Sequence, residues 1–220
     1  MWAVRGNAET WVRATTNTIF LVIPAVILAA GRSSRMGRSK ALLPHLDGKT
    51  TFVAHAVREL RAAGLHVILV VGRHDDEPLR AAVVELQAEF VSNPDPDRGQ
   101  LSSLVAGLDV ADHTYRAEAV VVLPVDVPLV TAAGIRALCT RAAAGGGAIL
   151  RSASDGRHGH PVLFTREVFD ELRHADPELG ARSVVRAAPS RVVDVEVGEP
   201  GVLVDVDTPD DYRRAFGRPV

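Results

Sequence analysis

The segment Ala25–Lys40 reads AVILAAGRSSRMGRSK and joins an apolar run to a loop of small, polar and cationic residues. The run from Ala25 to Ala29 predicts a strand that is buried on both faces. A loop that follows such a strand presents backbone N–H groups at the carboxyl edge of the sheet, where open α/β sheets bind their ligands. The segment therefore predicts both a sheet and the position of a binding site.

The loop has the composition of a phosphate-binding site. Ala29, Ala30 and Gly31 are small enough to let phosphate oxygens approach the backbone. Arg35 and Lys40 carry the positive charge that would neutralise a triphosphate. A solvent-exposed basic turn has the same composition, so composition alone leaves both interpretations open.

Two common glycine motifs do not fit this loop. Gly31 and Gly37 are separated by five residues, which excludes G-x-G-x-x-G, and Lys40 does not directly follow Gly37 as a Walker A motif requires. A generic dinucleotide-binding function is therefore disfavoured.

Strand and helix patterns alternate along the rest of the chain. The apolar runs at 66–72 and 119–125 predict buried strands, and the amphipathic pattern at 51–63 predicts a helix that begins after a threonine and ends before a glycine. This alternation predicts an α/β fold with a doubly wound, mostly parallel sheet of Rossmann-like type. Beyond residue 126 the rhythm is less strict, so we expect a small mixed or antiparallel edge in the C-terminal half. Further helices are expected at 78–87, 102–110, 132–144, 166–174 and from 208, and further strands at 90–91, 148–151, 161–164, 192–197 and 202–206.

Composition limits the classes of function. The 220 residues are 47% hydrophobic and 24% charged, which suits one α/β domain. The net charge of −2 comes from interspersed signs, so the chain lacks the basic stripe of a protein that binds nucleic acid or an anionic membrane. The single cysteine, Cys139, lies in a stretch that is expected to be helical and has the features of a buried structural thiol. This cysteine usage suits a reducing cytoplasm.

The N-terminus superficially resembles a secretory signal. Arg5 and Arg13 precede an apolar run from Ile19 to Ala30. Pro24 interrupts that run, and cleavage after Ala30 would remove the first strand. We therefore expect a cytoplasmic protein in which residues 1–23 are an extension, either poorly ordered or an upstream start, and residues 24–220 form the domain.

Two acidic positions are candidates for metal binding. Asp126 directly follows a strand, where its carboxylate could hold a hard cation such as Mg²⁺, although it could also close a turn. Asp205 and Asp207 would point to the same side of an extended segment. Because Asp207 or Thr208 would cap the helix that Pro209 begins, Asp205 is the better metal ligand.

Four further residues are candidates for substrate contacts. Ser102 and Ser103 follow a polar loop and could offer hydroxyl and N–H groups to a base or ribose, or could simply cap a helix. Asn93 precedes a proline and could bind the nucleotide or initiate a turn. His160, in Gly159-His160-Pro161, could be structural or could belong to the site.

The loop resembles the signature L-A-x-G-x-S-x-R-M-G-x-x-K of the MobA-like nucleoside-triphosphate transferases, which include the molybdenum cofactor guanylyl- and cytidylyltransferases. The matching residues are Leu28, Ala29, Gly31, Ser33, Arg35, Met36, Gly37 and Lys40. The resemblance runs from about residue 25 to residue 216 and implies Mg²⁺ at Asp126 and Asp205, contacts of the 99–104 stretch with the nucleobase, and an acceptor pocket near His160. The nucleotide-binding set that follows is Leu28, Ala29, Ala30, Gly31, Ser33, Arg35, Lys40, Asn93, Gly99, Ser102 and Ser103.

These residues predict a magnesium-dependent nucleotidyltransferase with Arg35, Lys40 and Asp126 as catalytic residues. The enzyme would move a nucleoside monophosphate from an NTP to a small phosphorylated acceptor and release pyrophosphate. An ionised acceptor oxygen needs no general base, so this chemistry depends on positioning and electrostatics. The residues Ala29-Ala30-Gly31 and the continuation Ala41-Leu42-Leu43-Pro44 resemble the corresponding residues of the cytidylyltransferase branch. This resemblance favours CTP and molybdopterin as the substrates.

Other functions stay open at this stage. Sugar-phosphate, methylerythritol-phosphate and phosphoenolpyruvate-like acceptors are alternatives within the same chemistry. A non-catalytic nucleotide-binding or regulatory module is an alternative of another class, and a nucleotide hydrolase is a third. The joint presence of Arg35, Lys40, Asp126 and Asp205 argues for a working enzyme.

Overall fold

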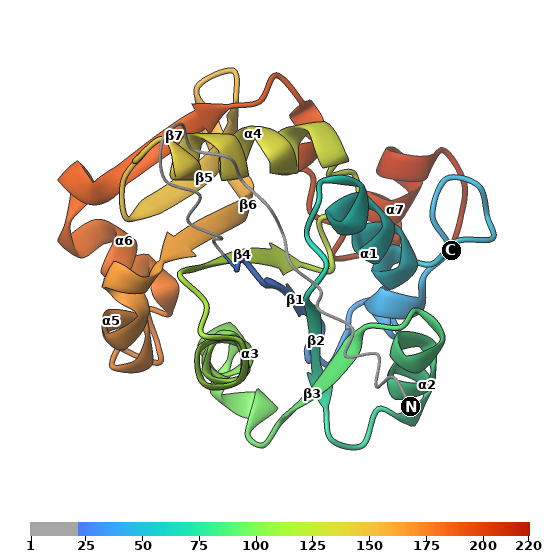
Figure 1. The fold of residues 1–220 in the computed structure, drawn as a ribbon. Helices are drawn as coiled ribbons and strands as arrows, with labels where there is room; N and C mark the ends of the chain where they lie inside the picture. Colours follow the sequence, from blue (N-terminus) through green and yellow to red (C-terminus); the bar gives the residue numbers. More distant parts are fainter. Residues whose placement is uncertain (1–21) are drawn as a thin grey trace, which may run out of the picture.

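The computed structural model describes residues 22–220, and the extension that we expect at 1–23 lies outside these residues except for its last two. A seven-stranded sheet forms the centre of the molecule, with strand order β3-β2-β1-β4-β6-β5-β7 (Figure 1). β1 pairs in parallel with β2 and with β4, so its carboxyl end lies in the middle of the sheet. The strands are β1 (Ala25–Leu28), β2 (Ile68–Arg73), β3 (Glu89–Asn93), β4 (Ala119–Pro124), β5 (Ile149–Ser154), β6 (Arg157–Thr165) and β7 (Val192–Glu196).

The predicted fold class is confirmed, including the mixed edge. β6 pairs antiparallel with both β4 and β5, and β7 then pairs in parallel with β5. Asp155 and Gly156 both have positive φ, at 53° and 72°, and form the tight turn between β5 and β6. Such a two-residue turn matches the twist of antiparallel strands, which explains the change of direction at this point.

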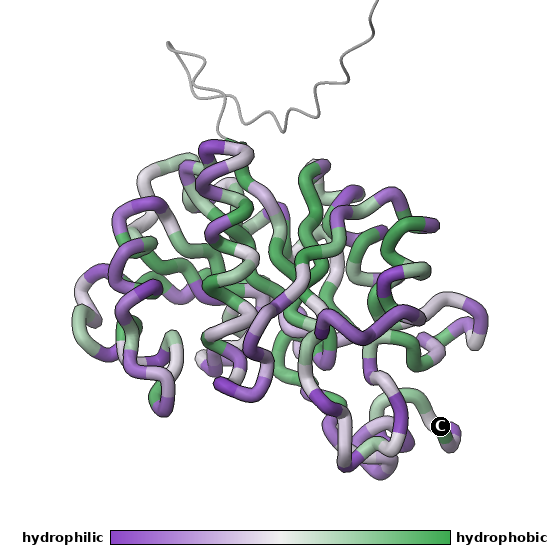
Figure 2. The backbone as a smooth tube through the Cα atoms, turned by 90° about the horizontal axis from the view of Figure 1, so that it is seen from below, coloured by the Kyte–Doolittle hydropathy of each residue, from purple (hydrophilic) through white to green (hydrophobic). Residues whose placement is uncertain are grey.

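Helices cover both faces of the sheet, and alternate residues of β1 pack against each layer. Ala25 and Ile27 belong to one apolar core, and Val26 and Leu28 belong to the other. Figure 2 shows hydrophobic residues in the central strands and hydrophilic residues along the outer helices and loops. One layer contains α1 (Phe52–Ala62), α2 (Glu77–Glu85), α4 (Ala132–Ala143) and α7 (Pro209–Phe216), and the other contains α3 (Gln100–Tyr115), α5 (Phe169–Arg173) and α6 (Ala181–Ala187).

Within residues 22–220 no helix has both the length and the apolar character needed to cross a bilayer. Cys139 is buried in α4 as a free thiol, as expected, and burial raises its pKa to about 11.

Two local predictions were wrong. The strand expected at 202–206 is instead a short 3-10 helix, η5 (Pro200–Leu203), followed by an extended segment. Val202 and Val206 are buried, and Val206 N donates to Asp126 O at 2.8 Å, but the segment forms no ladder with a neighbouring strand. The single helix expected at 166–174 divides into η3 (Arg166–Val168) and α5. In addition, α6 was not predicted, because seven residues carry little periodicity.

Close packing of α3 on the sheet depends on Gly107. A Cβ atom at this position would lie 2.4 Å from Val26 Cγ1 and 3.0 Å from Val71 Cγ2. Real side chains do not approach so closely, so any larger residue would push α3 away from β1 and β2. Since α3 begins beside the pocket described below, this spacing also determines where the helix N-terminus lies.

We expect Gly107→Ala to destabilise the protein by about 1–3 kcal/mol through overpacking. Helix propensity acts in the opposite direction, since alanine in a helix is favoured over glycine by about 1 kcal/mol. Urea denaturation of the variant and the wild type measures the net sign. A gain in stability would show that the α3 packing is not tight.

Candidate active site

A pocket of about 350 Å³ lies at the carboxyl end of β1, where the sequence predicts a ligand site. Four parts of the chain surround it: the loop after β1, the loop that leads into α3, the segment that follows β4 and the segment that precedes α7. Its lining residues are Leu28, Ala29, Ala30, Gly31, Arg32, Ser33, Ser34, Arg35, Lys40, Ala41, Pro96, Gly99, Gln100, Ser103, Val125, Asp126 and Asp207.

The loop after β1 folds back on itself around Ser33. The carbonyl oxygen of Ser33 accepts hydrogen bonds from Met36 N and Gly37 N, at 3.0 and 3.1 Å, and its hydroxyl oxygen accepts one from Lys40 N at 3.2 Å. The Met36 side chain is buried in the core and anchors the turn. A Cβ atom at Gly31 would meet no protein atom within 4 Å, so protein packing does not require glycine there. The open space beside Gly31 is consistent with the close approach of a ligand.

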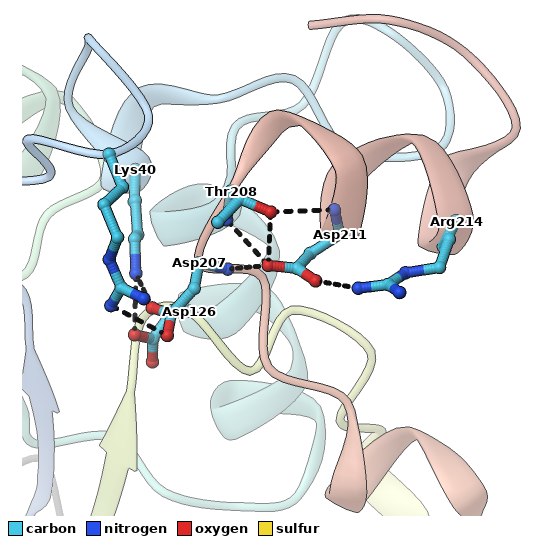
Figure 3. A network of polar contacts seen from close by, with 7 residues as sticks. Lys40, Asp126, Asp207, Thr208, Asp211 and Arg214 are labelled. Carbon is cyan, nitrogen blue, oxygen red and sulfur yellow. Dashed lines mark hydrogen bonds and ion pairs between the residues drawn. The ribbon is translucent and has the colours of Figure 1, made fainter.

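Lys40, in the loop after β1, joins the segment after β4 and the segment before α7 at the base of the pocket (Figure 3). Its ammonium group donates to Asp126 Oδ2 at 3.1 Å and to Asp207 Oδ1, and Arg35 Nη2 donates to Asp207 Oδ2 at 3.0 Å. The Lys40 side chain is only 13% exposed, so its charge acts in a partly desolvated environment. The structure thus brings together the three predicted catalytic residues Arg35, Lys40 and Asp126.

Asp207 belongs to this cluster, which corrects its sequence-based interpretation. Thr208 alone is the N-cap of α7 and forms a capping box with Asp211, whose carboxylate accepts from both Asp207 N and Thr208 N. The Asp207 side chain is therefore free to point into the pocket (Figure 3). The hydrogen bond from Lys40, with the positive charges of Lys40 and Arg35, lowers the pKa of Asp207. The capping-box spacing from Thr208 to Asp211 was the sequence signal that could have identified Asp207 as a site residue.

Asp205 lies at the edge of the same cluster. Partial burial and the negative charges of Asp126 and Asp207 raise its pKa. It does not line the pocket. The three carboxylates therefore form one electrostatically linked group, although within residues 22–220 no set of three metal-ligating side chains is arranged to enclose an ion.

The loop that leads into α3 is anchored by Asn93. This buried side chain donates from Nδ2 to the hydroxyls of Ser102 and Ser103, both at 2.9 Å, and its Oδ1 accepts from Asp95 N. Asn93 thus forms the turn that was one of its two interpretations. Gly99 and Ser103 line the pocket, whereas Asn93 and Ser102 hold the loop from behind. Direct contacts of these residues with a nucleotide stay a prediction.

His160 lies outside this pocket, on β6, and its neighbour Gly159 packs against η5. A Cβ atom at Gly159 would lie 2.0 Å from Val202 O, so only glycine permits this contact between β6 and η5. The Nδ1 atom of His160 is buried and has no hydrogen-bond partner among the described residues. Burial lowers the pKa of His160 to about 4, while the charge of Asp126 acts in the opposite direction. A neutral imidazole near the carboxylates is consistent with its predicted place beside an acceptor.

Two histidines that the sequence analysis did not identify hold the loop after Asp126. The rings of His45 and His55 are stacked with centroids 3.8 Å apart. Their Nε2 atoms donate to the carbonyl oxygens of Pro128, at 2.9 Å, and Val130, at 3.2 Å. Because a carbonyl only accepts, both rings carry their proton on Nε2, and both are buried and neutral. Burial lowers the pKa of each ring, to about 4 for His55.

These shifts predict that the protein loses stability in mild acid. Below the ordinary histidine pKa of about 6.5, the unfolded chain binds protons that the folded His45, His55 and His160 do not. The free energy of unfolding should therefore fall as pH falls from about 6.5 toward 4, by up to about 1.4 kcal/mol per pH unit for each histidine. Urea unfolding across this range measures the slope.

Two variants make the pH test specific. His55→Gln removes one of the buried titrating groups and should reduce the slope. His113→Gln, which changes an exposed histidine of α3, should leave it unaltered. A slope that is the same in the wild type and His55→Gln would contradict the assignment.

Comparisons with known proteins agree with this geometry. Residues 25–192 match the MobA-like NTP transferase domain. The chain is 27% identical over 198 residues to a molybdenum cofactor cytidylyltransferase of Escherichia coli (strain K12), covering 89% of this chain and 96% of that protein. It is 29% identical over 206 residues to a molybdenum cofactor guanylyltransferase of Rhizobium meliloti (strain 1021), covering 87% and 89%.

A solved structure has the same fold over nearly its whole length. The crystal structure of Rv0371c from Mycobacterium tuberculosis H37Rv superposes with a TM-score of 0.72 and 32% sequence identity, covering 90% of this chain and 98% of that one. A second structure of that protein, a complex with manganese, gives a TM-score of 0.67 at 30% identity and covers 89% and 98%.

Proposed function

The chain belongs to the MobA-like NTP transferase family and is a nucleotidyltransferase; from this premise we propose that it transfers CMP from CTP to a molybdopterin-type phosphorylated acceptor in a magnesium-dependent reaction. The observation that carries the proposal is the meeting of Lys40 with Asp126 and Asp207 at the base of a pocket lined by the phosphate loop. A cation between two carboxylates, beside open backbone N–H groups, is suited to position and neutralise a triphosphate.

The reaction needs positioning more than proton transfer. The triphosphate lies along the loop at 29–35, where Arg35 and Lys40 stabilise the charge that develops on the phosphate oxygens. An acceptor phosphate oxygen, which is ionised at neutral pH, attacks the α-phosphorus. The new phosphorus–oxygen bond forms as the bond to the β-phosphate breaks, and pyrophosphate leaves with that electron pair.

The acidic group has the donor chemistry for magnesium. Mg²⁺ is usually held by one or two carboxylates together with water and substrate phosphates, and Asp126 with Asp205, or with Asp207, offers such a pair. When bound, the ion would supply Lewis-acid stabilisation of the phosphate oxygens. Partial burial, together with the negative charges of Asp126 and Asp207, raises the pKa of Asp205. The manganese complex of the Mycobacterium tuberculosis relative supports a divalent cation in this fold.

The choice of CTP and molybdopterin rests on similarity. Ala29-Ala30-Gly31 resembles the cytidylyltransferase branch, and the Escherichia coli relative is a cytidylyltransferase. The Rhizobium meliloti relative is a guanylyltransferase, so GTP is the competing nucleotide. The unpartnered Nδ1 of His160, close to the carboxylates, supports an acceptor on the β6 side. The expected cytoplasmic location stays a prediction.

Pyrophosphate release tests the function directly. We expect turnover with magnesium and CTP when molybdopterin is the acceptor, and less with GTP, ATP or UTP. A panel of a sugar phosphate, methylerythritol phosphate and phosphoenolpyruvate tests the alternative acceptors. Preference for GTP would reverse the base assignment, and no turnover with any combination would favour a nucleotide-binding module.

Asp126→Ala should reduce turnover by at least about 100-fold, because it removes a carboxylate from the group that orients Lys40 and the metal. The fold should persist, since Asp126 lies partly exposed at the end of β4. Thermal unfolding checks the fold, and pyrophosphate release checks the activity. Asp210→Ala, which removes an exposed ion pair with Arg213 on α7, is the matched control and should retain activity. Full activity of Asp126→Ala would remove this residue from the catalytic group.

A further inference from the structure

A third cationic residue of the phosphate loop, Arg32, makes an ion pair across the pocket. Its Nε donates to Asp97 Oδ1 at 2.9 Å and its Nη2 donates to Asp97 Oδ2 at 2.5 Å. Asp97 lies in η2 (Pro96–Arg98), within the loop that leads into α3. Arg32, Pro96 and Gly99 all line the pocket, so the pair connects two of its walls.

The pair has features that an isolated surface ion pair lacks. Both side chains are more than half exposed, and single exposed pairs usually contribute little to stability. This pair is bidentate, a geometry that restricts orientation as well as distance. Arg73, at the end of β2, adds a third contact from Nη1 to Asp97 Oδ1 at 3.3 Å. Asp97 is therefore held from the phosphate loop and from the sheet at once.

The loop that carries Asp97 has two attachments. Asn93 holds its base through the hydroxyls of Ser102 and Ser103. Asp97 holds the tip of the loop. Among the described residues, the side-chain partners of Asp97 are Arg32 and Arg73. Without the tip contact, the 94–99 segment would be tied only at its ends, and the pocket wall made by Pro96 and Gly99 would lose its constraint.

We propose that Asp97 and Arg32 are a positioning pair that fastens the 94–99 loop to the phosphate loop and thereby sets the width of the nucleoside end of the pocket. This inference rests on the proposed function and on the predicted contact of the 99–104 stretch with the nucleobase, of which Gly99 and Ser103 line the pocket. Arg32 then acts through Asp97, and it differs from Arg35, whose partner Asp207 lies with the catalytic carboxylates. The competing role for Arg32 is that of a direct phosphate ligand.

The two roles predict opposite effects of a neutral substitution at Asp97. If Arg32 is a positioning residue, Asp97→Asn loosens the loop and raises the KM for the nucleotide by about fivefold, with kcat changed less than about twofold. If Arg32 binds phosphate, Asp97→Asn frees its guanidinium, and the KM stays the same or falls.

A double-mutant cycle completes the test. Arg32→Gln and Asp97→Asn should each raise the KM by about fivefold, and the double variant should raise it by about the same factor, because both changes break one interaction. Multiplication of the two effects to about 25-fold would overturn the proposal, as would an unchanged or lower KM for Asp97→Asn. Calorimetric titration with CTP and magnesium, without acceptor, should show the same pattern in Kd. Thermal unfolding temperatures should stay close to the wild type, and a loss of stability with unchanged nucleotide affinity would also overturn it.

Arg151 and Asp194 provide a matched control. They form a bidentate pair of the same type, with Nε to Oδ1 at 2.7 Å and Nη2 to Oδ2 at 2.9 Å, between β5 and β7 and away from the pocket. The same cycle with Arg151→Gln and Asp194→Asn should leave the nucleotide KM unaltered. Failure of the wild type to turn over any NTP would count against the proposed function alone, since the calorimetric cycle still reports on the pair.

Discussion

The contact of Lys40 with Asp126 and Asp207 is the constraint on which the site depends. It joins residues that are 86 and 167 positions apart along the chain. The sheet makes this possible, because β1 and β4 are parallel neighbours with Leu28 opposite Pro124, so that their loops leave the same edge at the same level. The bond from Val206 N to Asp126 O then brings the C-terminal segment to that edge. A site made of three distant segments exists only when the central sheet is complete.

Much of the fold could be predicted because local patterns and tertiary structure agree. The apolar runs at β1, β2 and β4 are buried on both faces, and Thr51 caps α1 through a hydrogen bond from Ala54 N, as its position suggested. The 202–206 segment shows the limit of this reasoning. Val202 and Val206 are buried as a strand pattern requires, yet they gain no ladder partner: Val206 N bonds to Asp126 O beyond β4, and Val202 O lies against Gly159 of β6. Periodicity reports burial, and burial alone does not specify strand pairing.

The site could be predicted in part for a related reason. The phosphate loop is contiguous in sequence, and Asp126 directly follows a strand, so both carry a local signal. His45, His55 and Asp97 carry none. The two histidines bind backbone carbonyls 83 and 75 residues away, and Asp97 binds an arginine 65 residues away. Contacts of this kind form only when folding brings distant segments together. In the sequence alone, a histidine or aspartate that will make such a contact cannot be distinguished from one that stays exposed to solvent.

The slightly acidic net charge of the chain is compatible with the triphosphate binding that we propose, because the charges of the pocket are arranged locally. Each cationic residue that lines the pocket has an acidic partner: Arg32 has Asp97, Arg35 has Asp207, and Lys40 has Asp126 and Asp207. A bare cluster of three cations would repel itself and would attract any polyanion without regard to shape. The acidic partners offset that repulsion and hold the cations in fixed positions before the ligand arrives. In the proposed function, nucleotide binding at Arg35 and Lys40 would exchange carboxylate contacts for phosphate contacts, so affinity would depend on the difference between them. This balance selects a ligand that offers negative charge to the cations and positive charge to the carboxylates they release. A phosphate chain that carries a divalent cation offers both.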